Sequence, residues 1–169
     1  MNPIIKNTIF LAIIACLSGL SIGVVNGITE PIIKERAIAS EKNNLEIIFP
    51  DSEFEALQYT DEEGTIIGAY VAKDKGFIFK ATAKGYNSSN PIITLVGLDN
   101  DGTVVNVIAL EQQETSGLGS RCFEETNIQK LYVGKKVGEE ADAISGATLT
   151  SNAMKLMISK AQEAYEELK

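Results

Sequence analysis

The chain has 169 residues, a formal net charge of −8, no histidine, no tryptophan and two cysteines. Because histidine is absent, Ser-His-Asp and Cys-His nucleophile pairs, an imidazole proton shuttle and histidine-containing zinc sites are excluded. Cys16 and Cys122 are too few to hold an iron–sulfur cluster alone, and neither lies in a C-x-x-C motif. The acidic charge argues against a nucleic-acid partner, since binding to phosphates relies on Lys and Arg. We therefore expect no metal and no catalytic side chain, and a reactive group that comes from outside the chain.

The first thirty residues are predicted to form a transmembrane anchor. From Thr8 to Ile28 there is no charged residue, and a helix of this length measures roughly 31 Å, enough to cross the hydrocarbon core of a lipid bilayer. Gly19, Gly23 and Gly27 repeat every four residues. This spacing either allows close contact with another membrane helix or reflects the general frequency of glycine in such helices.

Other interpretations of this segment fit less well. A cleaved signal peptide has a shorter apolar core, and a lipoprotein using Cys16 would not continue its apolar run so far beyond that residue. We expect one retained helix that spans the membrane once. Its orientation is open, because Lys6 precedes the helix while both acidic and basic residues follow it, so the positive-inside rule gives no clear answer. These following residues are Glu30, Lys34, Glu35 and Arg36.

Residues 31–169 are predicted to form one α+β domain with a mixed or antiparallel sheet and flanking helices. A helical connector covers about 31–50, with Pro31 in its first turn. Five runs have the character of strands: Glu53–Tyr59, Thr65–Ala72, Gly76–Ala83, Ile92–Leu98 and Thr103–Leu110. The segment Asp99-Asn100-Asp101-Gly102 is better explained as a hairpin turn than as a calcium loop, because the later ligands are missing.

The C-terminal segment is predicted to be an amphipathic helix. Its apolar residues recur at helical spacing and form one face: Met154, Met157, Ile158, Ala161, Tyr165 and Leu168. Directly before it lies a cluster of hydroxyl groups, in the segment Asp142-Ala143-Ile144-Ser145-Gly146-Ala147-Thr148-Leu149-Thr150-Ser151. Such a cluster at a helix start either binds an anion or caps the helix through Thr150 or Ser151. The residues alone favour the cap.

A second motif follows the last predicted strand. It reads Glu111-Gln112-Gln113-Glu114-Thr115-Ser116-Gly117-Leu118-Gly119-Ser120-Arg121. Two glycines around Leu118 indicate a tight loop whose backbone contacts a flat or bulky group, or an ordinary surface loop. The segment is neither a dinucleotide fingerprint nor a P-loop.

Together the two motifs resemble those of the FMN-binding domain family. The segment Asp142 to Thr148 is similar to its flavinylation motif, and Glu114 to Gly119 is similar to its E-T-P-G-L-G segment. Ser116 replaces the usual proline, and Gln112 stands where a histidine is common. The resemblance runs from the anchor through Gly85-Tyr86 to the C-terminal helix. The family includes the G subunit of the Rnf electron-transport complex and the C subunit of the sodium-pumping NADH:quinone reductase, and the length of this chain favours the former.

The resemblance implies specific roles for residues of both motifs. Thr148 would carry FMN through a phosphodiester bond made by a dedicated flavin transferase, and Asp142 matches the position that the transferase needs. Glu114, Thr115 and Leu118 would line the ribityl chain or the ring. The full set expected to bind the cofactor is Glu114, Thr115, Gly117, Leu118, Gly119, Ser145, Gly146, Ala147, Leu149 and Thr150.

The implied function is electron relay in a membrane complex that couples electron transfer between ferredoxin and NAD to ion movement. The partners would be the other membrane and peripheral subunits of an Rnf-type complex, and the C-terminal domain would lie on the extracytoplasmic side of the cell membrane. The chain would be redox-active without a complete active site of its own. Two alternatives stay open: a standalone anchored flavoprotein for extracytoplasmic electron transfer, and an anchored accessory or binding module that never receives flavin.

Overall fold

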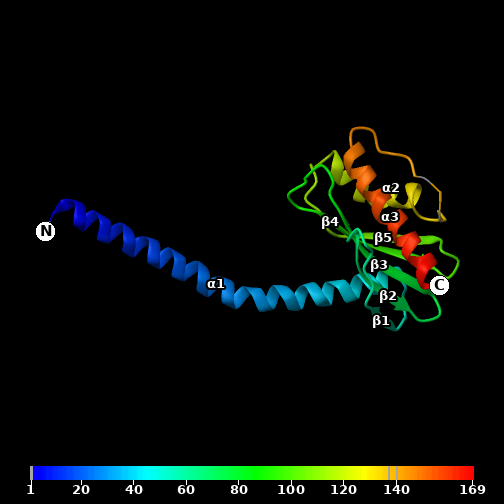
Figure 1. Ribbon diagram of the computed structural model, residues 1–169, viewed down its shortest axis with the longest axis horizontal. Helices are drawn as coiled ribbons and strands as arrows, with labels where there is room; N and C mark the ends of the chain where they lie inside the picture. The colour runs from blue at the N-terminus through cyan, green and yellow to red at the C-terminus, as the bar shows by residue number, and fades with distance from the viewer. Residues whose placement is uncertain (1, 137, 140) are drawn as a thin grey trace. The chain divides into compact units, whose positions relative to one another are not determined.

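The computed structural model describes residues 2–136, 138–139 and 141–169 (Figure 1). The chain divides into two compact units, Met1–Lys42 and Asn43–Lys169. The first unit consists of most of the long helix α1 (Pro3–Ile48). The second contains the last turns of α1, the sheet and the remaining helices.

Helix α1 carries the apolar N-terminal segment. Every side chain from residue 2 to residue 28 is exposed, so no part of the chain that the structure describes covers these apolar groups. Among the described helices, α1 is the one long and apolar enough to cross a membrane, and a bilayer is the environment that such a surface requires. The sequence predicted Pro31 in the first turn of a separate connector helix. In the structure Pro31 lies inside α1, which continues through it. Its missing N–H removes one backbone bond without ending the helix, as membrane helices tolerate.

The sheet is an antiparallel meander of five strands. They are β1 (Phe54–Leu57), β2 (Ile66–Ala72), β3 (Gly76–Ala83), β4 (Ile92–Asp99) and β5 (Val104–Glu111). Each strand pairs with the next one in the chain. All five predicted strands are confirmed, and of the two sheet types that the sequence allowed the structure has the antiparallel one.

The turn between β4 and β5 confirms the hairpin interpretation of residues 99–102. The carboxylate of Asp99 accepts hydrogen bonds of 2.9 Å from the backbone N–H groups of Asp101 and Thr103. The Gly102 N–H also donates to the Asp99 carbonyl, at 3.0 Å. The acidic side chain at the start of this turn is therefore used to close the hairpin.

Helix α3 (Thr148–Leu168) packs on one face of the sheet (Figure 1). The predicted apolar face is confirmed, because Met154, Met157 and Tyr165 are among the largest fully buried side chains. Leu168, at the end of the helix, is only partly buried. The Tyr165 hydroxyl donates a 2.6 Å hydrogen bond to the carbonyl of Asn100 and so fixes the end of α3 to the β4–β5 turn.

The other face of the sheet is covered by the last turn of α1. Leu45, Ile48 and Phe49 form a second apolar cluster with side chains of β2, β3 and β4. Successive side chains of a strand point to opposite faces, so Ile78 belongs to this cluster while the next residue, Phe79, belongs to the α3 side.

Two short helices were not predicted from the sequence. They are the 3-10 helix η1 (Gly119–Phe123) and helix α2 (Glu125–Leu131). Each is too short to show a helical repeat of apolar residues. Each nevertheless sends one side chain into the core: Cys122 is fully buried and Ile128 is nearly so.

The adjacent residues Ile47 and Ile48 allow a test of how the end of α1 supports the sheet. Ile48 is 7% exposed and Ile47 is 60% exposed. We expect Ile48→Ala to lower the free energy of unfolding by about 2–5 kcal/mol, because it leaves a cavity in the second cluster. Ile47→Ala should change it by less than about 0.5 kcal/mol. Denaturation of the full chain in detergent, followed by the near-ultraviolet circular dichroism of its buried tyrosines, measures both; equal effects would contradict this packing.

Candidate functional site

The two sequence motifs come together around one cavity of about 400 Å³ at the start of α3. Three segments far apart in the sequence line it: the β3–β4 loop, the loop after β5, and the segment that enters α3. The lining residues are Tyr86, Thr115, Leu118, Gly119, Gly146, Ala147, Thr148, Leu149 and Thr150. Eight of these nine residues belong to the set expected from the sequence, and Tyr86 is the addition.

Helix α3 begins at Thr148 without a side-chain cap. Ala147 occupies the N-cap position, and no side chain in the described part of the chain bonds to this end of the helix. The first rung of the helix runs from the Ser151 N–H to the Ala147 carbonyl, at 2.8 Å, so the N–H groups of residues 148–150 have no partner within the helix. Thr148 itself is exposed. Unpaired N–H groups and the helix dipole make such an end attractive to an anion.

The two hydroxyls considered as caps have other partners. Thr150 donates to the carboxylate of Glu114, at 2.5 Å. The Ser151 oxygen accepts the backbone N–H of Ile144, at 3.0 Å, and lies 3.6 Å from the Cys122 sulfur. The capping interpretation is therefore wrong, because both side chains turn back into the domain and leave the helix end open.

Glu114 is a buried carboxylate that joins the three segments of the site. It is 8% exposed. Its oxygens accept the backbone N–H groups of Tyr86 and Asn87, both at 3.1 Å, in addition to the Thr150 hydroxyl. The side chain therefore fixes the β3–β4 loop and the start of α3 to its own loop, and does not line the cavity.

Glycine is required where the backbone closes over this carboxylate. A Cβ atom at Gly85 would lie 2.6 Å from one Glu114 carboxylate oxygen, and a Cβ atom at Gly119 would lie 2.7 Å from the other. Both distances are shorter than van der Waals contact. Gly119 thus serves to bring its loop against Glu114 and Thr150, which places Leu118 at the cavity.

The cavity is open to solvent and has an apolar rim. Leu118 is 49% exposed and Leu149 is 58% exposed. None of the lining residues has a charged side chain. The site therefore offers a free hydroxyl, unpaired N–H groups and apolar surface, which suits the binding of an anionic group joined to a flat apolar one. It offers no carboxylate, amine or imidazole for proton transfer.

Besides Glu114, three residues expected at the site do not line the cavity. Gly117 adopts a positive φ of 76° in the loop between Glu114 and Leu118, and it is exposed, as are Ser145 and Asp142. Tyr86 was missed as a lining residue, although the pair Gly85-Tyr86 was part of the resemblance, because no sequence spacing connects a β3–β4 loop to a helix start sixty residues later.

Cys122 lies behind the start of α3 and is a packed thiol. Burial is the main cause that raises the pKa of this thiol above its ordinary value. Burial also raises the pKa of the nearby Tyr132 hydroxyl to about 12. Both groups are therefore protonated and uncharged at neutral pH.

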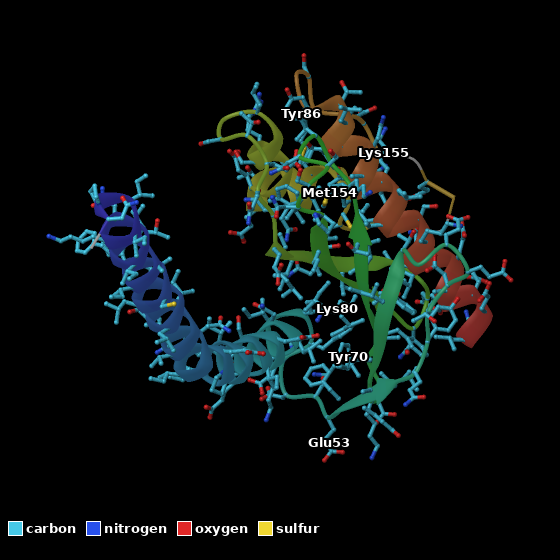
Figure 2. The ribbon with its side chains drawn as sticks, turned by 60° about the vertical axis from the view of Figure 1, so that its left-hand side comes forward. Glu53, Tyr70, Lys80, Tyr86, Met154 and Lys155 are labelled. Carbon is cyan, nitrogen blue, oxygen red and sulfur yellow. The ribbon has the colours of Figure 1, made fainter. Side chains whose placement is uncertain are left out.

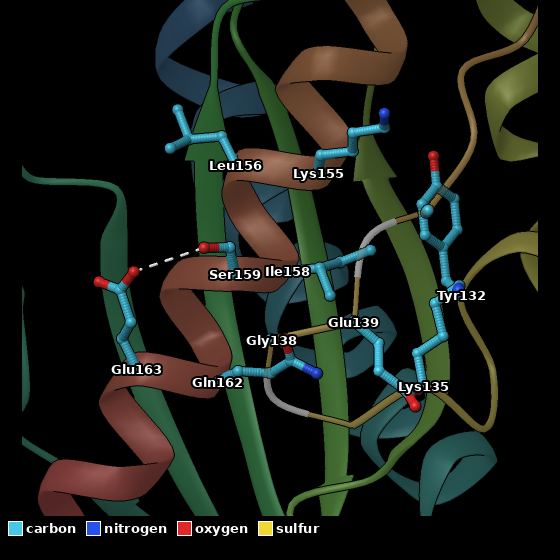
Figure 3. Close-up of a pocket in the computed structure, with 11 residues that line it drawn as sticks. Tyr132, Lys135, Gly138, Glu139, Lys155, Leu156, Ile158, Ser159, Gln162 and Glu163 are labelled. Atoms are coloured by element: carbon cyan, nitrogen blue, oxygen red, sulfur yellow. Dashed lines mark hydrogen bonds between the residues drawn. The ribbon is translucent and has the colours of Figure 1, made fainter.

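A second and larger cavity, of about 540 Å³, lies beside the middle of α3 (Figure 3). Tyr132 and Gln162 line it, and the Tyr132 hydroxyl and the Gln162 amide nitrogen are buried without a partner among the described residues. Ordered water satisfies buried donors of this kind. None of the residues expected to bind a ligand lines this cavity.

Comparison with known proteins identifies both parts of the chain. Residues 85–163 match the FMN-binding domain family, and residues 1–48 match the RnfG N-terminal region. The first match includes every lining residue of the 400 Å³ cavity.

Relatives match over nearly the full chain. The G subunit of the ion-translocating oxidoreductase complex of Vibrio atlanticus is 31% identical over 91% of this chain and 86% of its own length. The G subunit of the sodium-translocating ferredoxin:NAD(+) oxidoreductase complex of Acetobacterium woodii is 22% identical, over 98% and 93%. The proton-translocating counterpart of Clostridium ljungdahlii is 26% identical, over 96% and 91%. With an FMN-binding domain behind an RnfG-type N-terminal helix, the chain belongs to the family of G subunits of ion-translocating oxidoreductase complexes.

Proposed function

We propose that this chain is the electron-relay subunit of an ion-translocating ferredoxin:NAD oxidoreductase complex, with FMN joined covalently by its phosphate to the Thr148 hydroxyl. The observation that carries the proposal is the uncapped start of α3, which places an exposed Thr148 on the cavity built by both motifs. The family match supports FMN as the ligand, and the names of the relatives support the complex.

The helix start fits the phosphate end of FMN. A phosphodiester at Thr148 keeps a negative charge, and the free N–H groups of the first turn are donors for it. Thr150 and Ser151 contribute indirectly, because their hydroxyls are engaged elsewhere and leave those donors free.

The apolar rim fits the ring end of FMN. The isoalloxazine ring is flat and largely apolar, and Leu118 and Leu149 are partly exposed apolar side chains at the cavity. When bound, FMN supplies one- and two-electron transfer, which no side chain at this site provides. The protein holds and orients the cofactor, and the lack of an acid or base among the lining residues is consistent with relay of electrons to and from partner subunits.

Maturation requires a second enzyme in this proposal. A flavin transferase must reach Thr148, and Asp142 is exposed in the segment that leads into α3. Both residues are therefore accessible to a protein that acts from outside. Helix α1 would be embedded in lipid, with the domain on the extracytoplasmic side of the membrane.

The attachment site can be tested by mass and fluorescence. The full chain, produced together with a flavin transferase, should gain the mass of one FMN less water and show flavin fluorescence in a denaturing gel. Thr148→Ala should abolish both signals, because it removes the only oxygen that the proposal uses. Thr126→Ala, which removes an exposed threonine hydroxyl on α2, is the matched control and should keep them. An unmodified wild type would support the non-flavinylated module, and a flavinylated Thr148→Ala protein would move the site elsewhere.

The Glu114 clamp can be tested by an isosteric change. Glu114→Gln keeps the size of the side chain but replaces one acceptor oxygen by an NH₂ group that faces backbone N–H donors. We expect a loss of about 1–3 kcal/mol in unfolding free energy and a lower fraction of flavinylated protein by intact mass. Glu111→Gln makes the same charge change at an exposed position and should do neither. Full flavinylation and unchanged stability of Glu114→Gln would contradict the clamp.

The side of the membrane on which the domain lies can be tested by cysteine labelling. In a Cys16→Ala background the remaining Cys122 is fully buried, so a new cysteine reports its own exposure. Ser89→Cys, in the exposed β3–β4 loop, should react with a membrane-impermeant maleimide on intact cells, and Asn2→Cys should react only after lysis. The reverse pattern would place the domain in the cytoplasm.

Isolation from membranes separates the complex from a standalone flavoprotein. A tagged chain in mild detergent should copurify with further membrane subunits. A flavinylated chain that purifies alone under conditions that preserve membrane complexes would favour the standalone alternative.

A further inference from the structure

Tyr86 is an exposed aromatic side chain with no structural partner. It is 68% exposed, and its hydroxyl has no hydrogen bond to any described residue. It also takes no part in the ring contacts of the domain, which join Tyr59, Phe77, Phe79 and Tyr165. Contact between an aromatic ring and water is unfavourable. Packing within the fold therefore does not explain why a tyrosine stands at this position.

Exposed apolar side chains of the domain gather at the 400 Å³ cavity. After residue 48, five described residues are large, hydrophobic and exposed: Ile67, Tyr86, Leu118, Leu149 and Leu156. Three of the five line this one cavity, and Tyr86 is the aromatic one. Figure 2 shows Tyr86 at the end of the domain where α3 begins. A concentrated apolar rim of this kind indicates contact with a ligand or partner.

The backbone around Tyr86 is held rigidly although the ring is free. The N–H groups of Tyr86 and Asn87 both donate to the buried Glu114 carboxylate. The Asn87 amide also donates to the carbonyl of Gln113, at 3.0 Å. The residue on the other side, Gly85, has no room for a side chain. The loop is thus built to present the Tyr86 side chain at a fixed place on the rim.

We propose that Tyr86 is the ring-positioning residue of the site, and that its phenol ring stacks on the isoalloxazine ring of the FMN. The inference rests on the function proposed above. A phosphodiester at Thr148 fixes only one end of the cofactor, and the flexible ribityl chain would let the ring move. Stacking on an aromatic side chain whose backbone is anchored supplies the second point of attachment, at the end that exchanges electrons.

Two properties of the bound flavin test this contact separately. An excited flavin in contact with a phenol takes an electron from it and returns it without emission, so a stacked tyrosine quenches flavin fluorescence. A stacked ring also rotates with the protein, which time-resolved fluorescence anisotropy detects. Neither property depends on electron transfer by the assembled complex.

The experiment uses the flavinylated full chain in detergent, with emission normalised to the flavin absorbance. We expect Tyr86→Ala to keep the FMN mass increment, to raise flavin emission severalfold and to add a fast depolarisation component. Tyr86→Phe should restore the slow anisotropy decay, because it keeps a ring that can stack, but not the quenching, because phenylalanine is a poor electron donor. Ile67→Ala, which removes an exposed apolar side chain on β2 outside the cavity, should behave as the wild type. Near-ultraviolet circular dichroism confirms that each variant is folded.

Each outcome decides the inference. A flavinylated Tyr86→Ala chain with unchanged emission and anisotropy would overturn it while leaving the proposed function intact. The same result together with loss of copurifying subunits would assign Tyr86 to a contact with another chain instead. A wild-type chain that gains no FMN mass in the presence of the transferase would overturn both the proposed function and this inference.

Discussion

The buried carboxylate of Glu114 is the interaction on which the site depends. It accepts two backbone N–H groups from the β3–β4 loop and one hydroxyl from α3, so a single side chain joins three segments that the sheet alone would not bring together. A buried carboxylate is costly unless its oxygens are satisfied, and here these three donors satisfy them. The loop conformations and the start of α3 are therefore coupled, because movement of any one segment takes at least one donor away from the buried carboxylate.

The same arrangement explains why α3 starts without a cap. A helix that begins with Thr148 and has Thr150 and Ser151 in its first turn would ordinarily use a hydroxyl to satisfy its first N–H groups. Here Thr150 bonds to Glu114 and Ser151 to the backbone of Ile144. The hydroxyls that could close the helix end thus bond to neighbouring segments instead, and the N–H donors that remain free can donate to the phosphate of the proposed FMN.

The sequence predicted the elements better than the contacts. The strands and α3 follow from alternation and helical repeats, which are local. The resemblance assigned residues of both motifs to one cofactor, and eight of those residues line the same cavity. The role of Glu114 was not foreseen: the resemblance placed it against the cofactor, whereas its carboxylate faces the backbone of residues 86 and 87. Tyr86 was also missed as a lining residue. The role of Glu114 and the position of Tyr86 both depend on which loops meet at the end of the sheet. Packing between segments far apart in the sequence decides which loops meet, and no local sequence pattern records it. The helix η1, which brings Gly119 and Cys122 under α3, was hidden for the same reason.

The openness of the site gives a reason for the covalent bond that we propose. Leu118, Leu149 and Tyr86 remain about half or more exposed, so the cavity cannot enclose a ligand as deep cofactor sites do. A shallow site buries little apolar area. Because binding also costs the ligand its translational and rotational freedom, the affinity of this site for free FMN would be weak. The proposed tether would remove this limit, because binding of the ring would become intramolecular and its effective concentration would no longer depend on free FMN. The shallow rim can then remain open, which is what an electron-relay chain needs if its cofactor must be approached by donors and acceptors held on other chains.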